Sequence, residues 1–164
     1  MLDPADASVV VCTRFMGIAR TVRMALRGMN VRNVALAANR EQLLEAFENT
    51  EPDCLVLYVD NEKPDDEGLR FLNFIRRDEN SPNPRIPVVV LSPSREIPTI
   101  NAVMNAGAHG YVLFPASGDI LLRKITAAYT SRRAWIDRPD YVGPERKIDR
   151  EAAEALEAGE KTAV

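Results

Sequence analysis

The sequence predicts an α/β fold built on a doubly wound, five-stranded parallel sheet. Short apolar runs rich in β-branched residues alternate with segments whose apolar residues recur every three or four positions, the spacing of amphipathic helices. Strands that alternate with helices in this way form parallel sheets joined by right-handed crossovers. The chain of 164 residues contains no internal repeat and is long enough for one such domain with a short addition.

The expected strands are the apolar runs that turn residues separate. They are Ser8–Val11, Val31–Ala37, Cys54–Val59, Ile86–Leu91 and Tyr111–Phe114. The third run is apolar at consecutive positions, so we expect it in the middle of the sheet, where both faces are covered.

The expected helices have residues typical of helix ends. Asn39 can cap the second helix, and Gly28 and Asn30 lie near the end of the first. The helical segments are Phe15–Met29, a segment with Leu43, Leu44 and Phe47 on its core side, a segment marked by Leu69, Leu72 and Ile75, then Ile97–Ala106 and Ile120–Trp135. The order of elements predicts a flavodoxin-like domain over residues 1–136.

The composition argues against several classes of protein. The chain carries 21 Lys and Arg against 24 Asp and Glu, a formal charge of −3, which gives no electrostatic reason to expect a nucleic-acid partner. No apolar run approaches the ~18 residues that span a membrane, and the N-terminus lacks the pattern of a signal peptide. Cys12 and Cys54 lie in apolar runs and are expected as buried thiols of a reducing compartment. We therefore expect a cytoplasmic protein without a membrane partner.

Few residues suggest catalysis. His109 is the single histidine, which argues against sites with several histidine ligands, and its position between a helix and a strand predicts an exposed side chain. No glycine-rich phosphate loop and no nucleophile elbow follow the expected strands. We expect a protein that is not an enzyme, with a flavodoxin-like ligand-binding or enzymatic domain as the less favoured alternative.

Residues 137–164 are expected to form an extension in two parts. Arg138–Lys147 contains two prolines and a glycine and is expected to be irregular. Ile148–Lys161 is rich in Ala and Glu and predicts a short helix, whose apolar stripe consists of Ile148, Ala152 and Leu156. A lone helix of this length is marginal in water, so it either frays or packs on its own domain or a partner.

Functional residues are expected where the parallel strands end, because ligands of open α/β sheets bind beyond the carboxyl ends of the strands. The residues at these ends are Thr13, Arg14, Asp60, Ser92, Phe114 and Pro115. Asp60 is followed by an acidic loop that is expected to be solvated, with Glu62, Asp65, Asp66 and Glu67.

Three segments at these strand ends resemble bacterial response-regulator receiver domains of the CheY type. DNEKPDDEG at 60–68 is similar to the phospho-acceptor loop, in which Pro and Gly follow the acceptor Asp by four and eight residues. VVVLS at 88–92 resembles the strand that ends in a Ser or Thr switch residue. GAHGYVLFP at 107–115 resembles the segment with a switch aromatic and a proline that is usually cis. The resemblance covers about Ser8 to Trp135 and implies Asp60 as phospho-acceptor with Ser92 and Tyr111 as switch residues.

The expected pocket departs from the family pattern. The resemblance places Thr13 and Arg14 where receiver domains have the acidic pair that binds Mg²⁺, and Phe114 where they have a lysine. A hard cation needs several oxygen ligands, and Asp60 alone is a weak candidate. We therefore expect no metal or other cofactor, and we expect phosphoryl transfer to be slow, since it depends on charge neutralisation.

Two hypotheses give Arg14 a role. In the first, Arg14 pairs permanently with Asp60 and mimics a neutralised acceptor; in the second, it binds Asp60 after a partner kinase has phosphorylated it. Simpler interpretations are a solvated Arg14 and an Asp60 that only bonds nearby backbone amides. Ser92 is then an ordinary strand-end residue and Tyr111 a half-buried packing residue.

The extension contains a second, less specific resemblance. YVGPERK at 141–147 is similar to a Tyr-x-Gly-Pro-Asp/Glu-Arg-Arg segment associated with bacterial signalling proteins. Tyr141 would be an aromatic anchor, Gly143 and Pro144 would fix a turn, and Arg146 would supply charge to a peptide that docks on a partner. The alternative is a linker that wraps its own domain.

These observations favour a response regulator with one receiver domain and an atypical pocket, which acts by protein–protein contact with weak or no phosphorylation. The resemblance implies an output face on the fourth helix, fifth strand and fifth helix, and a homodimer is one partner arrangement that we expect. The alternative is a phosphorelay receiver that a histidine kinase or phosphotransfer protein phosphorylates at Asp60.

Overall fold

The computed structural model describes residues 3–162 and contains a five-stranded parallel sheet with the strand order β2-β1-β3-β4-β5. After a short 3₁₀ turn, η1 (Pro4–Asp6), the strands are β1 (Ser8–Cys12), β2 (Asn33–Ala37), β3 (Cys54–Tyr58), β4 (Val88–Ser92) and β5 (Gly110–Leu113). The sheet that the sequence predicts is confirmed, and the predicted third strand is the central one.

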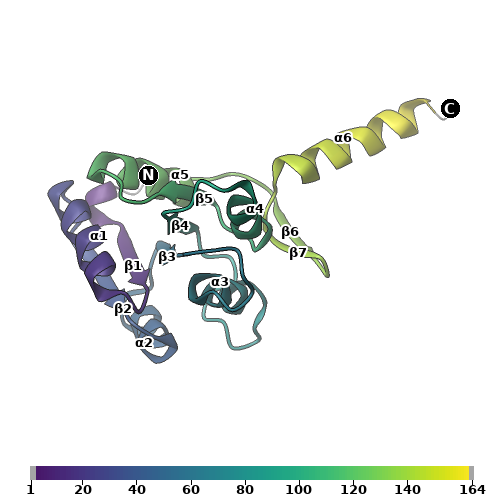
Figure 1. The fold of residues 1–164 in the computed structure, drawn as a ribbon. Helices are drawn as coiled ribbons and strands as arrows, with labels where there is room; N and C mark the ends of the chain where they lie inside the picture. The colour runs from purple at the N-terminus through teal and green to yellow at the C-terminus, as the bar shows by residue number, and fades with distance from the viewer. Residues whose placement is uncertain (1–2, 163–164) are drawn as a thin grey trace.

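Five helices cover the two faces of the sheet (Figure 1). They are α1 (Met16–Gly28), α2 (Arg40–Thr50), α3 (Glu67–Arg77), α4 (Ile97–Asn105) and α5 (Gly118–Tyr129). The buried residues of α1 and α5 form one apolar cluster with one face of the strands, and those of α2, α3 and α4 form another with the opposite face. Successive strand residues such as Leu55 and Val56 point into different clusters, because side chains alternate across a strand.

The helix ends agree with the prediction at Asn39 and disagree at Trp135. The Asn39 side chain accepts a hydrogen bond from the Gln42 amide at 2.9 Å and caps α2. By contrast, α5 ends at Tyr129, whereas the sequence predicts a helix as far as Trp135. Arg133 donates instead to the carbonyl of His109 at 2.8 Å, and Trp135 begins a strand. These tertiary contacts end the helix where no glycine or proline marks its end.

The extension begins with a β-hairpin, so the prediction of an irregular segment at 138–147 is wrong. Strand β6 (Trp135–Arg138) pairs antiparallel with β7 (Tyr141–Pro144), and helix α6 (Lys147–Thr162) follows. Both prolines are compatible with the hairpin, since Pro139 lies in the turn and Pro144 ends a strand. The predicted domain boundary between residues 136 and 137 falls inside β6.

The hairpin packs against the domain. Tyr141 is 0% exposed and its hydroxyl donates to the carbonyl of Pro144 at 2.6 Å. Gly143 lies against the backbone of Gly107, in the turn between α4 and β5, where a Cβ on Gly143 would lie 2.7 Å from the Gly107 Cα. The segment was expected either to dock on a partner or to wrap its own domain, and in the structure it packs on its own domain.

Arg76 and His109 lie beneath the hairpin. The Arg76 guanidinium is buried, donates from Nε to the Gly107 carbonyl at 2.9 Å, and lies 4.8 Å from the centre of the Trp135 ring. The Val88 amide donates to His109 Nδ1 at 3.2 Å, and an Arg76 nitrogen lies 3.3 Å from the same atom. The prediction of an exposed His109 is wrong, because the hairpin and Arg76 cover the turn that carries it.

A methyl group at position 143 tests whether the hairpin is part of the folded domain. We expect Gly143→Ala to lower the free energy of unfolding by about 1–3 kcal/mol, because its Cβ would crowd Gly107 and the Tyr141 hydroxyl. Gly17→Ala is the matched control: its Cβ meets open space on α1, and it should stabilise by roughly 0.5–1 kcal/mol. Urea denaturation measures both. A Gly143→Ala protein as stable as the wild type would mean that the hairpin does not pack as described.

His109 makes the stability depend on pH. Burial and the charges of Arg76 and Arg133 lower its pKa from 6.5 to about 3, so between these values only the unfolded chain takes up the proton. This contribution is therefore complete above about pH 6.5 and is lost as the pH falls toward 3. We expect the wild type to lose about 1 kcal/mol per pH unit more than His109→Asn between pH 6 and 4. Urea titration at each pH gives the free energy of unfolding. Equal changes of this free energy between pH 6 and 4 in the two proteins would contradict the prediction.

Candidate functional site

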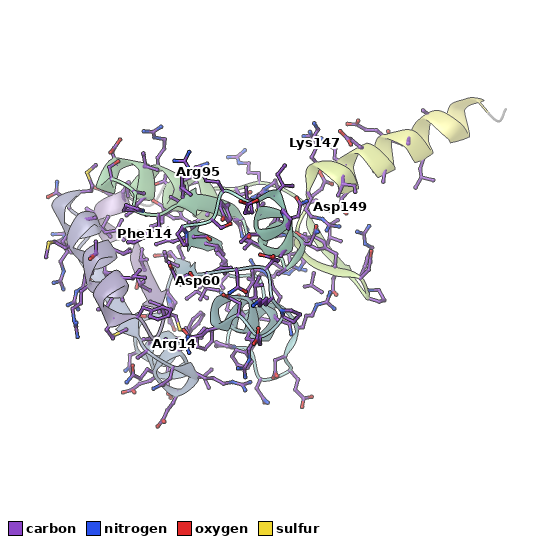
Figure 2. All side chains as sticks on the ribbon, viewed as in Figure 1. Arg14, Asp60, Arg95, Phe114, Lys147 and Asp149 are labelled. Atoms are coloured by element: carbon purple, nitrogen blue, oxygen red, sulfur yellow. The ribbon has the colours of Figure 1, made fainter. Side chains whose placement is uncertain are left out.

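A hollow of about 290 Å³ lies beside Asp60 at the carboxyl ends of β1 and β3. Figure 2 labels Arg14, Asp60 and Phe114, which come from three different strand ends. The residues that line the hollow are Arg14, Phe15, Tyr58, Asp60, Asn61, Lys63, Asp65, Asp66, Glu67 and Arg70. The structure therefore brings Arg14 and Asp60 together at one site, as the strand order requires.

Asp66 fixes the loop that carries Asp60. Its buried carboxylate accepts hydrogen bonds from the amides of Asp60 at 2.9 Å, Asn61 at 3.2 Å and Leu69 at 3.1 Å. The last of these bonds caps α3, and the first two hold the start of the loop to the same helix. The expectation of a wholly solvated acidic loop is thus wrong for Asp66. Its place one residue before a helical pattern could have identified it as a cap.

Gly68 is required by the close approach of α3 to β3. A Cβ at this position would overlap the carbonyl oxygen of Tyr58, the last residue of β3. The glycine lets the first turn of α3 lie directly on the strand end, and Asp60 is exposed next to it. The spacing of Asp60 and Gly68 in the sequence therefore has a steric reason.

Thr13 and Arg14 do not provide acidic groups and do not pair with Asp60. Thr13 is buried, and its hydroxyl oxygen accepts from the Phe15 amide at 3.2 Å. The Arg14 amide donates to Glu67 at 2.9 Å, while its guanidinium lies 4.9 Å from the centre of the Phe15 ring. Among the described ion pairs of 4.0 Å or less there is none between Arg14 and Asp60. The hypothesis of a permanent Arg14–Asp60 pair thus has no support in this geometry.

A row of three aromatic rings lies beside Asp60. Tyr58 makes edge-on contacts with Phe15, with ring centres 5.7 Å apart, and with Phe114, with ring centres 6.2 Å apart. The Tyr58 hydroxyl donates to Asp60 at 3.4 Å, and burial together with the nearby Asp60 charge raises the pKa of Tyr58. Phe114 precedes Pro115 through a cis peptide bond, as the resemblance implied. Sequence reasoning identified Phe114 but missed Phe15 and Tyr58, which only the fold brings together.

A chain of hydroxyl groups leads away from this loop. Ser92 is fully buried at the end of β4, and its hydroxyl oxygen accepts from the Ser94 amide at 3.2 Å. The Ser94 hydroxyl donates to Thr99 at 3.0 Å, and Thr99 donates to Glu62 at 3.0 Å. Tyr111 is half-buried and its hydroxyl donates to the Ser94 carbonyl at 2.5 Å. Ser94 and Thr99 were not singled out from the sequence, because their link to Glu62 spans two loops.

The docking candidates of the extension lie away from the hollow. Tyr141, Gly143 and Pro144 are buried against their own domain, and Arg146 lies 3.5 Å from the centre of the Tyr141 ring. Because Tyr141 is buried in this structure, its aromatic ring is not exposed to a partner, and its role as a docking anchor stays a prediction. Among the described residues, no group of three or more His, Cys, Asp and Glu could hold a metal ion. No described helix has the length and apolar composition to cross a membrane.

The strand order, the carboxylate after the central strand and the cis proline after β5 define a receiver domain of two-component signalling. The family model described as response regulator receiver domain matches residues 15–126, so the chain belongs to this family. Receiver domains act through contacts with other proteins, among them kinases and phosphotransfer proteins.

Solved structures share the fold. A response regulator from Thermotoga maritima is 26% identical, with a TM-score of 0.60 over 76% of this chain and 98% of that one. A CheY-like receiver domain protein from Methanospirillum hungatei JF-1 is 20% identical, with a TM-score of 0.57 over 76% of this chain and 94% of that one. The two-component response regulator-like protein APRR1 of Arabidopsis thaliana is 27% identical over 100 residues. These residues are 61% of this chain and 16% of that protein.

Removal of the Asp66 carboxylate tests its role in the Asp60 loop. We expect Asp66→Ala to lower the free energy of unfolding by about 1–2 kcal/mol, because α3 loses its cap. The amides of Asp60 and Asn61 should also exchange faster with deuterium, since they lose their acceptor. Asp65→Ala removes an exposed neighbouring carboxylate and should stay within about 0.5 kcal/mol of the wild type. Equal losses in both variants would contradict a specific role for Asp66.

Proposed function

We propose that this chain is a cytoplasmic response regulator that signals by protein–protein contact, and that its Asp60 pocket is phosphorylated weakly or not at all. The observation that carries the proposal is the row of Phe15, Tyr58 and Phe114 beside Asp60. In addition, the resemblance places Thr13 and Arg14 where the family has the acidic pair that binds Mg²⁺, and Phe114 where it has a lysine.

The chemistry of phosphoryl transfer supports this conclusion. Attack by a carboxylate on a phosphoryl donor accumulates negative charge, and catalysis consists mainly of neutralising and positioning that charge. Asp60 has the exposure that an acceptor needs, but the carboxylate of Asp66 is already engaged by three backbone amides. Asp65 and Glu67 also line the hollow, but among the described residues no group of three or more carboxylates is arranged to hold a metal ion, and a hard cation needs several oxygen ligands.

The second candidate is a receiver that a partner phosphorylates at Asp60, with a pocket of a different kind. Arg14, Lys63 and Arg70 line the hollow next to Asp60 and would supply positive charge to a phosphoryl group without a metal. The chain's one histidine, His109, lies in the turn before β5 beneath the hairpin, so a phosphohistidine donor would come from a partner.

The face formed by α4, β5 and α5 is the proposed contact surface. Ile97 at the start of α4 is 69% exposed, Ile120 at the start of α5 is 40% exposed and Leu113 on β5 is 36% exposed. Large apolar side chains that remain exposed on neighbouring elements are typical of interaction sites. The same face would serve a homodimer or a different protein partner.

Beryllofluoride binding tests the proposed pocket. With Mg²⁺ present, we expect no stable adduct at Asp60 by fluorine NMR. The metal lacks the acidic pair that would bind it, and the fluoride atoms lack the lysine that would balance their charge. The triple variant with Thr13→Asp, Arg14→Asp and Phe114→Lys should bind at least about tenfold better, since it restores two carboxylates and a cation.

Two further variants make the test specific. Asp60→Asn in the triple variant should abolish the adduct, and Arg14→Ala in the wild type separates the second candidate from the first. A wild-type adduct that forms without Mg²⁺ and disappears in Arg14→Ala would favour the metal-free phosphorelay receiver. A wild-type adduct as stable as that of the triple variant would overturn the weak-pocket proposal.

A further inference from the structure

Helix α4 is tied at its two ends to two different parts of the molecule. Thr99, in its first turn, contacts the loop that follows Asp60, and Asn105, its last residue, contacts the C-terminal extension. Thr99 and Asn105 are six residues apart on this helix, which is a rise of about 9 Å. It carries no charged residue, so its position depends on these polar ends and on the packing of residues such as Val103.

The first contact is a directional chain of hydrogen bonds. Ser94 donates to Thr99 and Thr99 donates to the Glu62 carboxylate, each over 3.0 Å. A chain of hydroxyl groups that ends on a charged acceptor is stronger than its separate bonds, because each donor polarises the next. A hydrogen bond from its own backbone amide, together with the bond from Thr99, lowers the pKa of Glu62. Thr99 is buried, whereas Glu62 is exposed in the Asp60 loop, so this bond joins an exposed side chain of the loop to a buried residue of α4.

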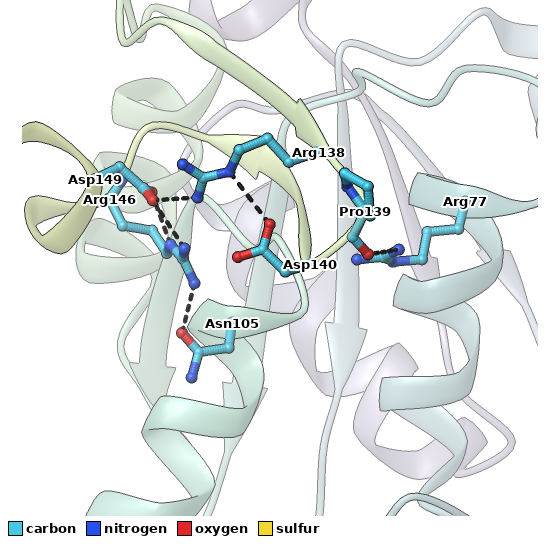
Figure 3. A network of polar contacts seen from close by, with 7 residues as sticks. All are labelled: Arg77, Asn105, Arg138, Pro139, Asp140, Arg146 and Asp149. Atoms are coloured by element: carbon cyan, nitrogen blue, oxygen red, sulfur yellow. Dashed lines mark hydrogen bonds and ion pairs between the residues drawn. The ribbon is translucent and has the colours of Figure 1, made fainter. Parts of the chain in front are cut away.

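The second contact joins the end of α4 to the start of α6 (Figure 3). Arg146 donates to Asn105 at 2.8 Å and makes two parallel bonds to Asp149, of 2.8 and 2.9 Å. Arg138, on β6, adds a third bond to the same carboxylate at 2.7 Å. The side chain of Asp149 is only 4% exposed, and these bonds hold its pKa far below the usual range. The first turn of α6 is thus fixed to the hairpin and, through Arg146, to α4.

We infer that α4 couples the Asp60 loop to α6, so that a change at Glu62 alters how firmly the first turn of α6 is held. A contact made in one state and lost in the other supplies the free-energy difference that such coupling needs, and the coupling acts in both directions. The inference goes beyond the proposed function, because it requires a change in the loop but neither phosphate nor metal at Asp60.

Helix α6 is suited to report this coupling. It leaves the domain on the side of α4 and extends away from it (Figure 1). Ile148 and Leu156 are 64% and 71% exposed on its apolar stripe, and the remaining described side chains after Asp149 are exposed as well. A change in the first turn of α6 therefore alters the direction in which the helix and its exposed apolar stripe point.

A second route must be separated from α4. Helix α3 begins at the Asp60 loop through Asp66, and Arg77 near its end donates to the carbonyl of Pro139 in the hairpin turn at 3.2 Å. A signal that passed through α3 would not need Asn105. The two routes therefore predict different results when Asn105 is removed.

Hydrogen exchange of the full-length chain tests the inference. The amides of Asp149 and Arg150 both donate to the Arg146 carbonyl and report the first turn of α6. We expect Glu62→Ala to speed their exchange by about fivefold, the lower range of measured couplings. Asn105→Ala should speed it by a similar factor, and Glu62→Ala should add nothing further in that background.

Matched controls use neighbouring exposed residues. Asp65→Ala removes a carboxylate of the same loop and Asn101→Ala removes an amide of α4 one turn before Asn105; neither should change the exchange. Unchanged exchange in Glu62→Ala would overturn the inference. If exchange is faster in Asn105→Ala alone, Asn105 only holds the first turn of α6 in place and transmits nothing from the Asp60 loop. An effect of Glu62→Ala that persists in Asn105→Ala would assign the coupling to α3. None of these outcomes depends on whether Asp60 accepts phosphate.

Discussion

The attachment of the C-terminal extension depends on the buried guanidinium of Arg76. Removing a charge from water costs several kcal/mol unless its donors are satisfied. Arg76 donates to the carbonyls of Gly107, Pro84 and Ile86 and faces Trp135, so backbone dipoles and an aromatic ring take the place of a carboxylate partner. Burial lowers its pKa to about 10, which still leaves it charged at neutral pH. One side chain thus joins α3, the segments before β4 and β5, and the hairpin.

The Asp60 hollow and the hairpin lie at opposite ends of β5 and of its neighbouring strands. The Asp60 hollow lies at the carboxyl ends of the strands, while Arg76 and the hairpin hold the turn that precedes β5. The hairpin buries Tyr141, and Arg146 after it donates to Asn105 at the end of α4, so residues 135–149 are packed on the receiver domain. The described side chains of α6 that follow Asp149 are exposed.

The backbone around the Asp60 hollow has the shape of a receiver domain, whereas the proposed function rests on the side chains that line it. Gly68 and the cis bond before Pro115 maintain the close approaches that shape the loops. The proposal of weak phosphorylation rests on Thr13, Arg14 and Phe114, which lie where the resemblance implies an acidic pair and a lysine. Backbone shape and pocket chemistry can diverge, because the shape depends on sterics at a few glycines and prolines, whereas the chemistry depends on groups that leave the fold unaffected when they change.

The sequence by itself determined the order of the strands and helices, the central place of Cys54–Val59 and the position of Asp60, because apolar periodicity encodes burial along each element. It also placed the Asn39 cap correctly, because this side chain bonds to the first turn of its own helix and the pattern is local. It could not determine the partial burial of His109, the end of α5 or the hairpin at 135–144. Those features rest on Arg76 and Arg133, whose side chains donate to the carbonyls of Gly107 and His109, far away in the chain. Such contacts leave no local pattern, so only the tertiary structure, which satisfies the buried polar groups together, decided them.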